Sequence, residues 1–237
     1  MSGLGGSAAD LRARLEGSPG DAAALLREGA EAGLPEAQAA YGQMLLDGRG
    51  VPADAVAALG WFRKAAAQGH AMAINMIGRC HEKGWGTAVD RDAAARCFRV
   101  AAERGLDWGM YNYGGALGLG AGVPQDEAAA MGWFQRAAAM GHIKSINFVG
   151  GYHEEGRLTV RDMAKAALCY RLAAEGGDFR GQFNHGRLLA EAGRIDEALD
   201  WICRAGDTAS PDFKAKMRAY CEAAPLAALN RMAERLR

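Results

Sequence analysis

The sequence lacks the short motifs that usually mark an enzyme. Its 237 residues contain no G-x-G-x-x-G turn, no P-loop lysine, no H-E-x-x-H pair and no C-x-x-C. Those motifs bind dinucleotides, nucleoside triphosphates and zinc, or carry out thiol redox chemistry. We therefore predict a non-enzymatic protein, without catalytic residues, metal or cofactor.

An excess of one charge and long apolar runs are also missing. The 28 basic residues are balanced by 28 acidic ones, whereas nucleic-acid binders usually carry a basic stripe. No stretch approaches the 18 apolar residues of a membrane span, and the N-terminus MSGLGGSAAD has no signal-peptide pattern. We expect a cytoplasmic protein that binds neither nucleic acid nor membrane.

What the chain does contain is a repeat of 36 residues. Several independent columns share this period, which is typical of a solenoid. They comprise two sets of glycines, a bulky pair, an aspartate and a doubled alanine: Gly42, Gly78, Gly114, Gly150 and Gly186; Gly69, Gly105, Gly141 and Gly177; Trp61-Phe62, Cys97-Phe98, Trp133-Phe134 and Cys169-Tyr170; Asp54, Asp90, Asp126 and Asp162; Ala65-Ala66, Ala101-Ala102, Ala137-Ala138 and Ala173-Ala174.

Each repeat is predicted to be a pair of helices, here called helix A and helix B. In the first repeat, helix A begins at Pro35 and ends at Asp47-Gly48, and helix B follows the N-cap Asp54 and ends at Gly69. Glycine inside helix A, as at Gly42, costs about 1 kcal/mol relative to alanine. We expect this glycine to allow close approach of a neighbouring helix backbone.

The combined pattern resembles the Sel1-like repeat, a relative of the tetratricopeptide repeat, over about residues 20–206. The resemblance implies a right-handed α/α superhelical solenoid and a role as adaptor or scaffold for a protein or peptide partner. Some secreted proteins of this family resemble disulfide-stapled arrays, but this chain lacks their paired cysteines. Its five thiols should be reduced, with Cys97 and Cys169 buried as apolar residues.

The period divides the chain into three regions. Residues 1–34 are predicted to be a leader and an N-terminal capping half-repeat. Residues 35–206 hold about five repeats, at 35–70, 71–106, 107–142, 143–178 and 179–206. Residues 207–237 are predicted to be C-terminal capping helices, one from Ser210-Pro211 to about Ala223 and one from Pro225 to Arg237.

Four histidines could suggest chemistry. His81-Glu82 and His153-Glu154 lie 72 residues apart, at a helix A position otherwise filled by leucine. They are interpreted as packing residues, because two repeats separate them by about 20 Å, too far to share a metal ion. His70 and His142 follow turn glycines and are expected in exposed loops.

The predicted partner-binding site is the concave face formed by successive A helices. Its columns vary where the packing columns stay constant, and aromatic and arginine residues are frequent interface anchors. The alternative is that this face is merely solvated or packs between repeats. The candidate residues are Asn75, Arg79, Trp108, Tyr111, Asn147, Phe183 and Arg187.

Two other functions stay open. One is an enzyme or small-molecule regulator with a site between repeats, which the lack of converging titratable groups disfavours. The other is helical-repeat RNA binding with one base per repeat, which would need a more basic groove. Oligomeric state and the identity of the partner cannot be read from the sequence.

Overall fold

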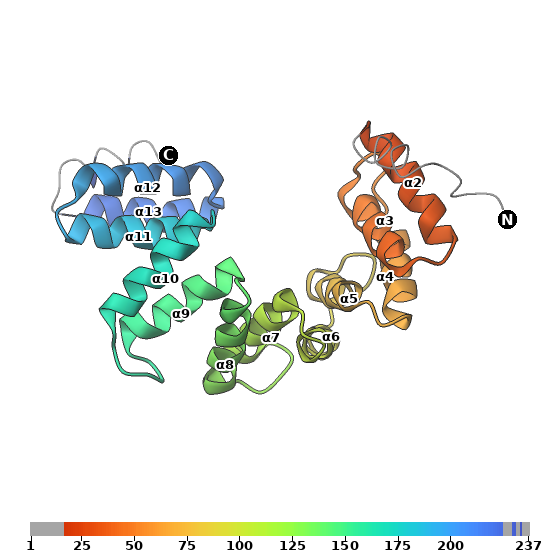
Figure 1. The fold of residues 1–237 in the computed structure, drawn as a ribbon, viewed down its shortest axis with the longest axis horizontal. Coiled ribbons are helices and arrows are strands. Elements are labelled where there is room, and N and C mark those ends of the chain that lie inside the picture. The colour runs from red at the N-terminus through yellow and green to blue at the C-terminus, as the bar shows by residue number, and fades with distance from the viewer. Residues whose placement is uncertain (1–16, 225–228, 231–232, 234–237) are drawn as a thin grey trace. The chain divides into compact units, whose positions relative to one another are not determined.

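The computed structural model describes residues 17–224, 229–230 and 233. The first 16 residues of the expected leader and capping half-repeat, and most of the helix expected from 225 to 237, lie outside these residues. Within them the chain is all α, as predicted, with no strand (Figure 1). The helices are α2 (Pro19–Glu31), α3 (Pro35–Asp47), α4 (Ala55–Ala67), α5 (Ala71–Lys83), α6 (Arg91–Glu103), α7 (Asp107–Leu119), α8 (Glu127–Ala139), α9 (Ile143–Glu155), α10 (Met163–Glu175), α11 (Phe179–Glu191), α12 (Ile195–Thr208) and α13 (Pro211–Ala223).

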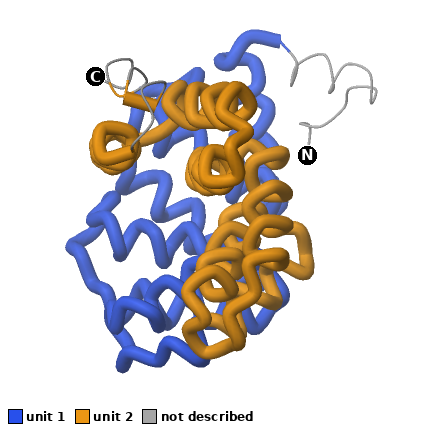
Figure 2. Tube along the Cα trace, turned by 90° about the vertical axis from the view of Figure 1, so that its left-hand side faces the viewer, with its two compact units in different colours: residues 1–130 blue, residues 131–237 orange. Residues whose placement is uncertain are grey.

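The chain divides into two compact units, residues 1–130 (unit 1) and 131–237 (unit 2), and the division falls within α8 (Figure 2). The same packing order recurs inside each unit. Helix A packs on helix B of its own repeat, as α5 does on α6 and α9 on α10, and helix B packs on the next helix A. Successive A helices also touch, as α5 and α7 do in unit 1 and α9 and α11 do in unit 2.

Aspartates begin the B helices as predicted. Asp54 and Asp90 each accept a hydrogen bond from the backbone N–H three residues later, at 2.9 and 2.8 Å. Asp126 and Asp162 do the same. Each cap satisfies one of the donors that the first helical turn leaves free.

Histidines begin two of the A helices, so neither of them lies in an exposed loop and that prediction is wrong. The Nδ1 of His70 accepts from the backbone N–H of Ala73 at 3.1 Å, and the Nδ1 of His142 accepts from that of Ser145 at 3.3 Å. His142 is buried and His70 half-buried. Asp178 is the equivalent cap of α11, accepting from Gly181.

The helix A glycines do allow close packing, but mainly against a side chain rather than a backbone. A Cβ added to Gly78 would lie 2.6 Å from Cε1 of Phe98, and one added to Gly150 would lie 2.8 Å from Cε1 of Tyr170. Backbone approaches backbone at Gly109, where a Cβ would lie 2.7 Å from the carbonyl carbon of Ala101. The small residues of the doubled-alanine column therefore do bring α6 and α7 together.

The turn between α9 and α10 departs from the other turns at one residue. Gly50, Gly86 and Gly122 have φ between 66° and 75°, and Leu158 takes the equivalent place with φ 58°. Among the described residues, Leu158 is the one residue other than glycine with positive φ. This conformation is unfavourable for a bulky L-residue, so the fourth repeat keeps strain that the first three avoid.

Replacing Leu158 by glycine is expected to stabilise the protein by about 0.5–1 kcal/mol. The left-handed conformation costs about 1–2 kcal/mol for an L-residue, and greater freedom of glycine in the unfolded chain offsets part of the gain. Val160→Gly, two residues later and without positive φ, should not stabilise. Denaturant midpoints measure both changes. A Leu158→Gly protein less stable than wild type would show that the leucine side chain is needed for packing.

Candidate functional site

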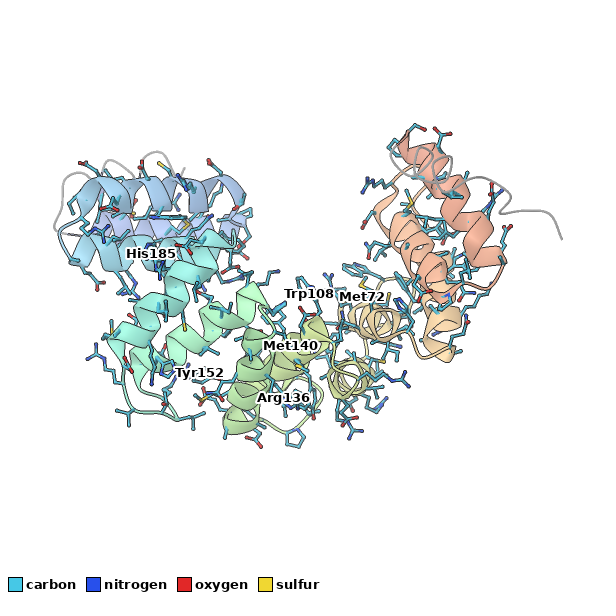
Figure 3. All side chains as sticks on the ribbon, in the orientation of Figure 1. Met72, Trp108, Arg136, Met140, Tyr152 and His185 are labelled. Carbon is cyan, nitrogen blue, oxygen red and sulfur yellow. The ribbon has the colours of Figure 1, made fainter. Side chains whose placement is uncertain are left out.

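An exposed apolar pair lies on the A helices of unit 1. Met72 of α5 and Trp108 of α7 occupy the same position of neighbouring repeats, and each is more than a third exposed. Figure 3 labels both side chains on these two helices, which touch each other. Tyr111 lies one turn after Trp108, with the two rings edge to face at 6.2 Å. This Met72–Trp108 surface therefore presents two partly exposed, large apolar side chains on helices that touch each other.

The guanidinium of Arg79 is engaged within its own repeat rather than presented to a partner. Its guanidinium lies over the ring of Trp85, in the turn after α5, with 5.0 Å from Cζ to the ring centroid. This cation–π contact ties the helix to its own turn. Arg79 is half-buried, and its guanidinium already packs on a ring of its own repeat.

Asn75 and Asn147 are structural ties within their own units. Asn75 is 2% exposed, and its Oδ1 accepts a hydrogen bond from Nδ2 of Asn112 at 2.8 Å. Asn147 is also buried, and its Oδ1 accepts from Nδ2 of Asn184 at 3.0 Å. Each bond joins two successive A helices. Buried amides need such partners, so these two residues support the face rather than offering free groups on it.

Phe183 lies in the core of unit 2. It packs edge to face against Phe213 and Tyr220 of α13, at 5.7 and 5.4 Å between ring centroids. The sequence column places it with Tyr111, which is half-buried. Because α13 covers this part of α11, Phe183 is removed from the exposed candidates.

Arg187 belongs to an ion-pair network of three helices of unit 2. Its Nη2 donates to both carboxylate oxygens of Glu154, at 2.6 and 2.7 Å, and its Nη1 donates to Glu191 at 2.9 Å. The hydroxyl of Tyr170 donates to the same Glu154 at 2.7 Å. Burial, together with this hydrogen bond to Glu154, raises the pKa of the Tyr170 phenol. The network binds α9, α10 and α11 together.

A metal site requires several His, Cys, Asp or Glu side chains that lie close together. No set of three or more His, Cys, Asp or Glu side chains in the described residues could hold a metal ion. The Nδ1 atoms of His81 and His153 are buried without a hydrogen-bond partner. The two residues recur at the same position, two repeats apart, and both are half-buried.

No disulfide joins the five cysteines, as predicted. Cys97 and Cys169 are half-buried rather than fully buried. Burial raises the pKa of Cys80 and of Cys221 from an ordinary value of 9.0 to about 11. At neutral pH these two side chains are therefore neutral thiols that pack as small apolar groups.

Of the seven predicted residues, the structure places two on an exposed or half-exposed aromatic surface, Trp108 and Tyr111. Met72 joins them although it was not selected from the sequence. The signal was present, since Met72 lies 36 residues before Trp108 in the same column. Methionine is common in cores as well as on binding surfaces, and only the fold shows which way this side chain faces.

The class of protein follows from this geometry: an all-α repeat protein whose layers are helix pairs with a 36-residue period. Four matches to the Sel1 repeat model cover residues 35–70, 71–106, 109–142 and 143–178. They extend over more than half of the chain, so the protein belongs to the Sel1 repeat family. No curated protein matches the sequence significantly.

Solved structures share the fold at low sequence identity. A Sel1 repeat protein from Oxalobacter formigenes is 24% identical, with 95% of this chain and 98% of that one aligned and a TM-score of 0.77. A protective antigen of uropathogenic Escherichia coli with an SLR fold is 23% identical over 95% of this chain and 58% of that one, with a TM-score of 0.59. An immunity protein from Pseudomonas aeruginosa is 13% identical over 85% of this chain and 80% of that one, with a TM-score of 0.57.

Among the residues that the structure describes, no helix combines the length and the apolar character needed to cross a lipid bilayer.

Proposed function

We propose that this protein is a non-enzymatic adaptor or scaffold that binds a protein or peptide segment on the A-helix face of unit 1. One observation carries the proposal: Met72 and Trp108 are exposed at the same position of two neighbouring A helices. The other repeats have Glu36, Lys144 and Arg180 at this position, so the core does not require an apolar residue there, and tryptophan is among the residues enriched at interface hot spots. The family membership is consistent with a scaffold.

The surroundings of this pair favour recognition over catalysis. Asn75 and Asn112 bond to each other, and Arg79 lies over Trp85. These contacts stiffen α5 and α7, and a stiff surface loses little conformational entropy when a partner binds. The proposed partner inserts apolar side chains beside the indole of Trp108, with Tyr111 supporting the ring from the edge.

The test is a double variant, Trp108→Ala with Met72→Ala, compared with wild type. The partner is first captured from the source cell by crosslinking to wild-type protein, and its affinity is then measured by calorimetry. Loss of two central anchors should weaken binding by more than about 2 kcal/mol, or roughly thirtyfold. The melting temperature should stay within a few degrees, because both side chains are partly exposed.

Val89→Ala is the matched control, since Val89 is an exposed residue of unit 1 in the turn between α5 and α6. It should leave both affinity and stability unchanged. If the double variant binds as tightly as wild type, the partner binds elsewhere and this face is not the site. An early melting transition in the double variant would instead assign Met72 and Trp108 to the core.

A further inference from the structure

A second surface distinguishes the fourth repeat from the first three. It is formed by the exposed side chains of residues 157–172, which span the turn between α9 and α10 and most of α10 (Figure 1), and is here called the α10 face. Its large apolar side chains are exposed by 42–86%: Leu158, Val160, Leu168 and Leu172. The buried side of α10, which packs in the direction of α9 and α11, is formed by other residues, Ala166, Tyr170, Ala173 and Ala174.

Comparison between repeats shows that these residues are not required by the fold. Leu168 stands where the first three repeats have Gly60, Arg96 and Gly132. Val160 stands where they have Pro52, Ala88 and Pro124, and Leu158 replaces a turn glycine in each case. The same helix pair thus forms three times without them. Exposed leucine and valine at these positions add nothing to the core.

The backbone conformation of Leu158 is a second, independent indication that this surface has a function. Leu158 is held at φ 58°, in a conformation that glycine adopts freely and that the other turns reserve for glycine. Strain that persists where a simple substitution would remove it is characteristic of functional positions. Leu158 is 54% exposed, so its side chain is presented to solvent.

The charges around these residues are mainly positive. Residues 157–172 contain four basic side chains and one acidic one. Arg161 and Lys165 stand where the first three repeats have only uncharged residues: Ala53, Val89 and Gln125 for the former, and Ala57, Ala93 and Ala129 for the latter. The fourth repeat therefore differs from the first three by having additional basic and additional aliphatic side chains in the same segment.

The pairs that these cations make are weak ones. Lys165 lies 3.3 Å from Asp162, and Arg171 lies 3.3 Å from Glu175. Arg157 pairs with Glu155. In each pair the basic side chain is more than half exposed, and exposed pairs contribute little. They can exchange for a partner's carboxylates at low cost.

We propose that the α10 face is a second docking surface, which binds an acidic amphipathic helix of another protein. Leu168 and Leu172 are one turn apart, and Ala164 extends the stripe by one turn in the other direction. Such an i, i+4 ridge fits the groove of a facing helix. Acidic residues flanking the partner's apolar stripe would meet Arg161, Lys165 and Arg171.

The test uses a fluorescein-labelled synthetic helix with leucines spaced one turn apart and glutamates at most other positions. A matched helix has lysine in place of glutamate. Wild-type protein should bind the acidic helix at least about tenfold more tightly, a difference of about 1.4 kcal/mol. Added salt should weaken the binding, because the attraction is between exposed charges.

Three variants sharpen the result. Leu168→Ser with Leu172→Ser should weaken binding of the acidic helix at least about tenfold, whereas Val56→Ser should not change it. Val56 is the exposed residue of α4 equivalent to Ala164 of α10. Leu158→Gly should weaken binding several-fold while raising stability, a combination that loss of folding cannot produce. Circular dichroism confirms that each variant retains its helices.

Equal binding of the two helices, or unchanged binding by the leucine variant, would overturn the proposal. A separate experiment measures binding of the protein to vesicles of phosphatidylcholine with phosphatidylserine. Binding to these vesicles without binding to the acidic helix would assign the α10 face to an anionic lipid surface and also reject the proposal. Because Trp108 and Met72 are intact throughout, failure here leaves the proposed function of unit 1 untouched.

Discussion

Gly78→Val is expected to destabilise the protein by about 3 kcal/mol, at the upper end of the usual cost of overpacking. The added Cβ would lie 2.6 Å from Cε1 and 2.7 Å from Cδ1 of Phe98, and 3.1 Å from Cβ of Cys97. Phe98 of α6 is 3% exposed, and protein interiors are packed so densely that its ring cannot move without displacing neighbours. Relief would require separating the two helices of the repeat.

Gly60→Val provides the matched control. Gly60 also lies inside a helix, but a Cβ there would have nothing within 4 Å apart from its own helix backbone and its chain neighbours. Valine has slightly better helix propensity than glycine, so this change should be neutral or stabilise by a few tenths of a kcal/mol. Urea denaturation followed by circular dichroism measures both. A Gly78→Val protein as stable as wild type would mean that Phe98 can reorient, and that the glycine column has another cause.

Glu154→Ala should cost about 2–3 kcal/mol of stability. The change leaves the guanidinium of Arg187, which is mostly buried, with Glu191 alone, and it leaves the Tyr170 hydroxyl without its acceptor. Breaking a fully buried ion pair costs about 3–5 kcal/mol. Partial exposure of both side chains and the remaining pair with Glu191 reduce that figure.

The control is Glu82→Ala, at the same position two repeats earlier. Glu82 pairs with Lys83 on the surface at 3.3 Å, and such pairs contribute about 0–1 kcal/mol. Gly115 and Phe98 stand where unit 2 has Arg187 and Tyr170, so Glu82 has neither partner. Its removal should change stability by less than about 0.5 kcal/mol. Equal effects of the two substitutions would show that the network of Glu154 contributes nothing.

The same network gives stability a dependence on alkaline pH. The pKa of Tyr170 in the folded protein is raised above its ordinary value of 10.0. The unfolded chain therefore loses this proton first, and ionisation favours unfolding. The contribution is fully present below pH 10 and decreases as the pH rises above it. Tyr170→Phe should flatten the stability profile in this range.

The sequence by itself determined the layers of this protein. The 36-residue period predicted the helix pairs, and every A helix from α3 to α11 begins 36 residues after the last. Capping aspartates and turn glycines fixed the ends of the helices, because these signals are local and act through the nearest backbone groups. The glycine column correctly indicated a close contact, although a side chain rather than a backbone comes closest, as Phe98 does at Gly78.

The sequence could not determine which residues of one column are buried and which are exposed. Tyr111 and Phe183 are equivalent in the repeat, yet only Phe183 is buried, because α13 packs over α11. His142 was expected in a loop and instead caps a helix, because its ring can turn back to the N–H groups of the next turn.

The candidate site shows the same division. The columns of the A helices drew attention to Trp108, but they equally selected Asn75 and Arg187, whose polar groups are held by Asn112 and Glu154. Residues at equivalent positions of the repeat point in the same direction from their helices. Their exposure depends on which other helix packs against that side. That helix comes from a different part of the chain, so only the tertiary structure decided which predicted anchors are available to a partner.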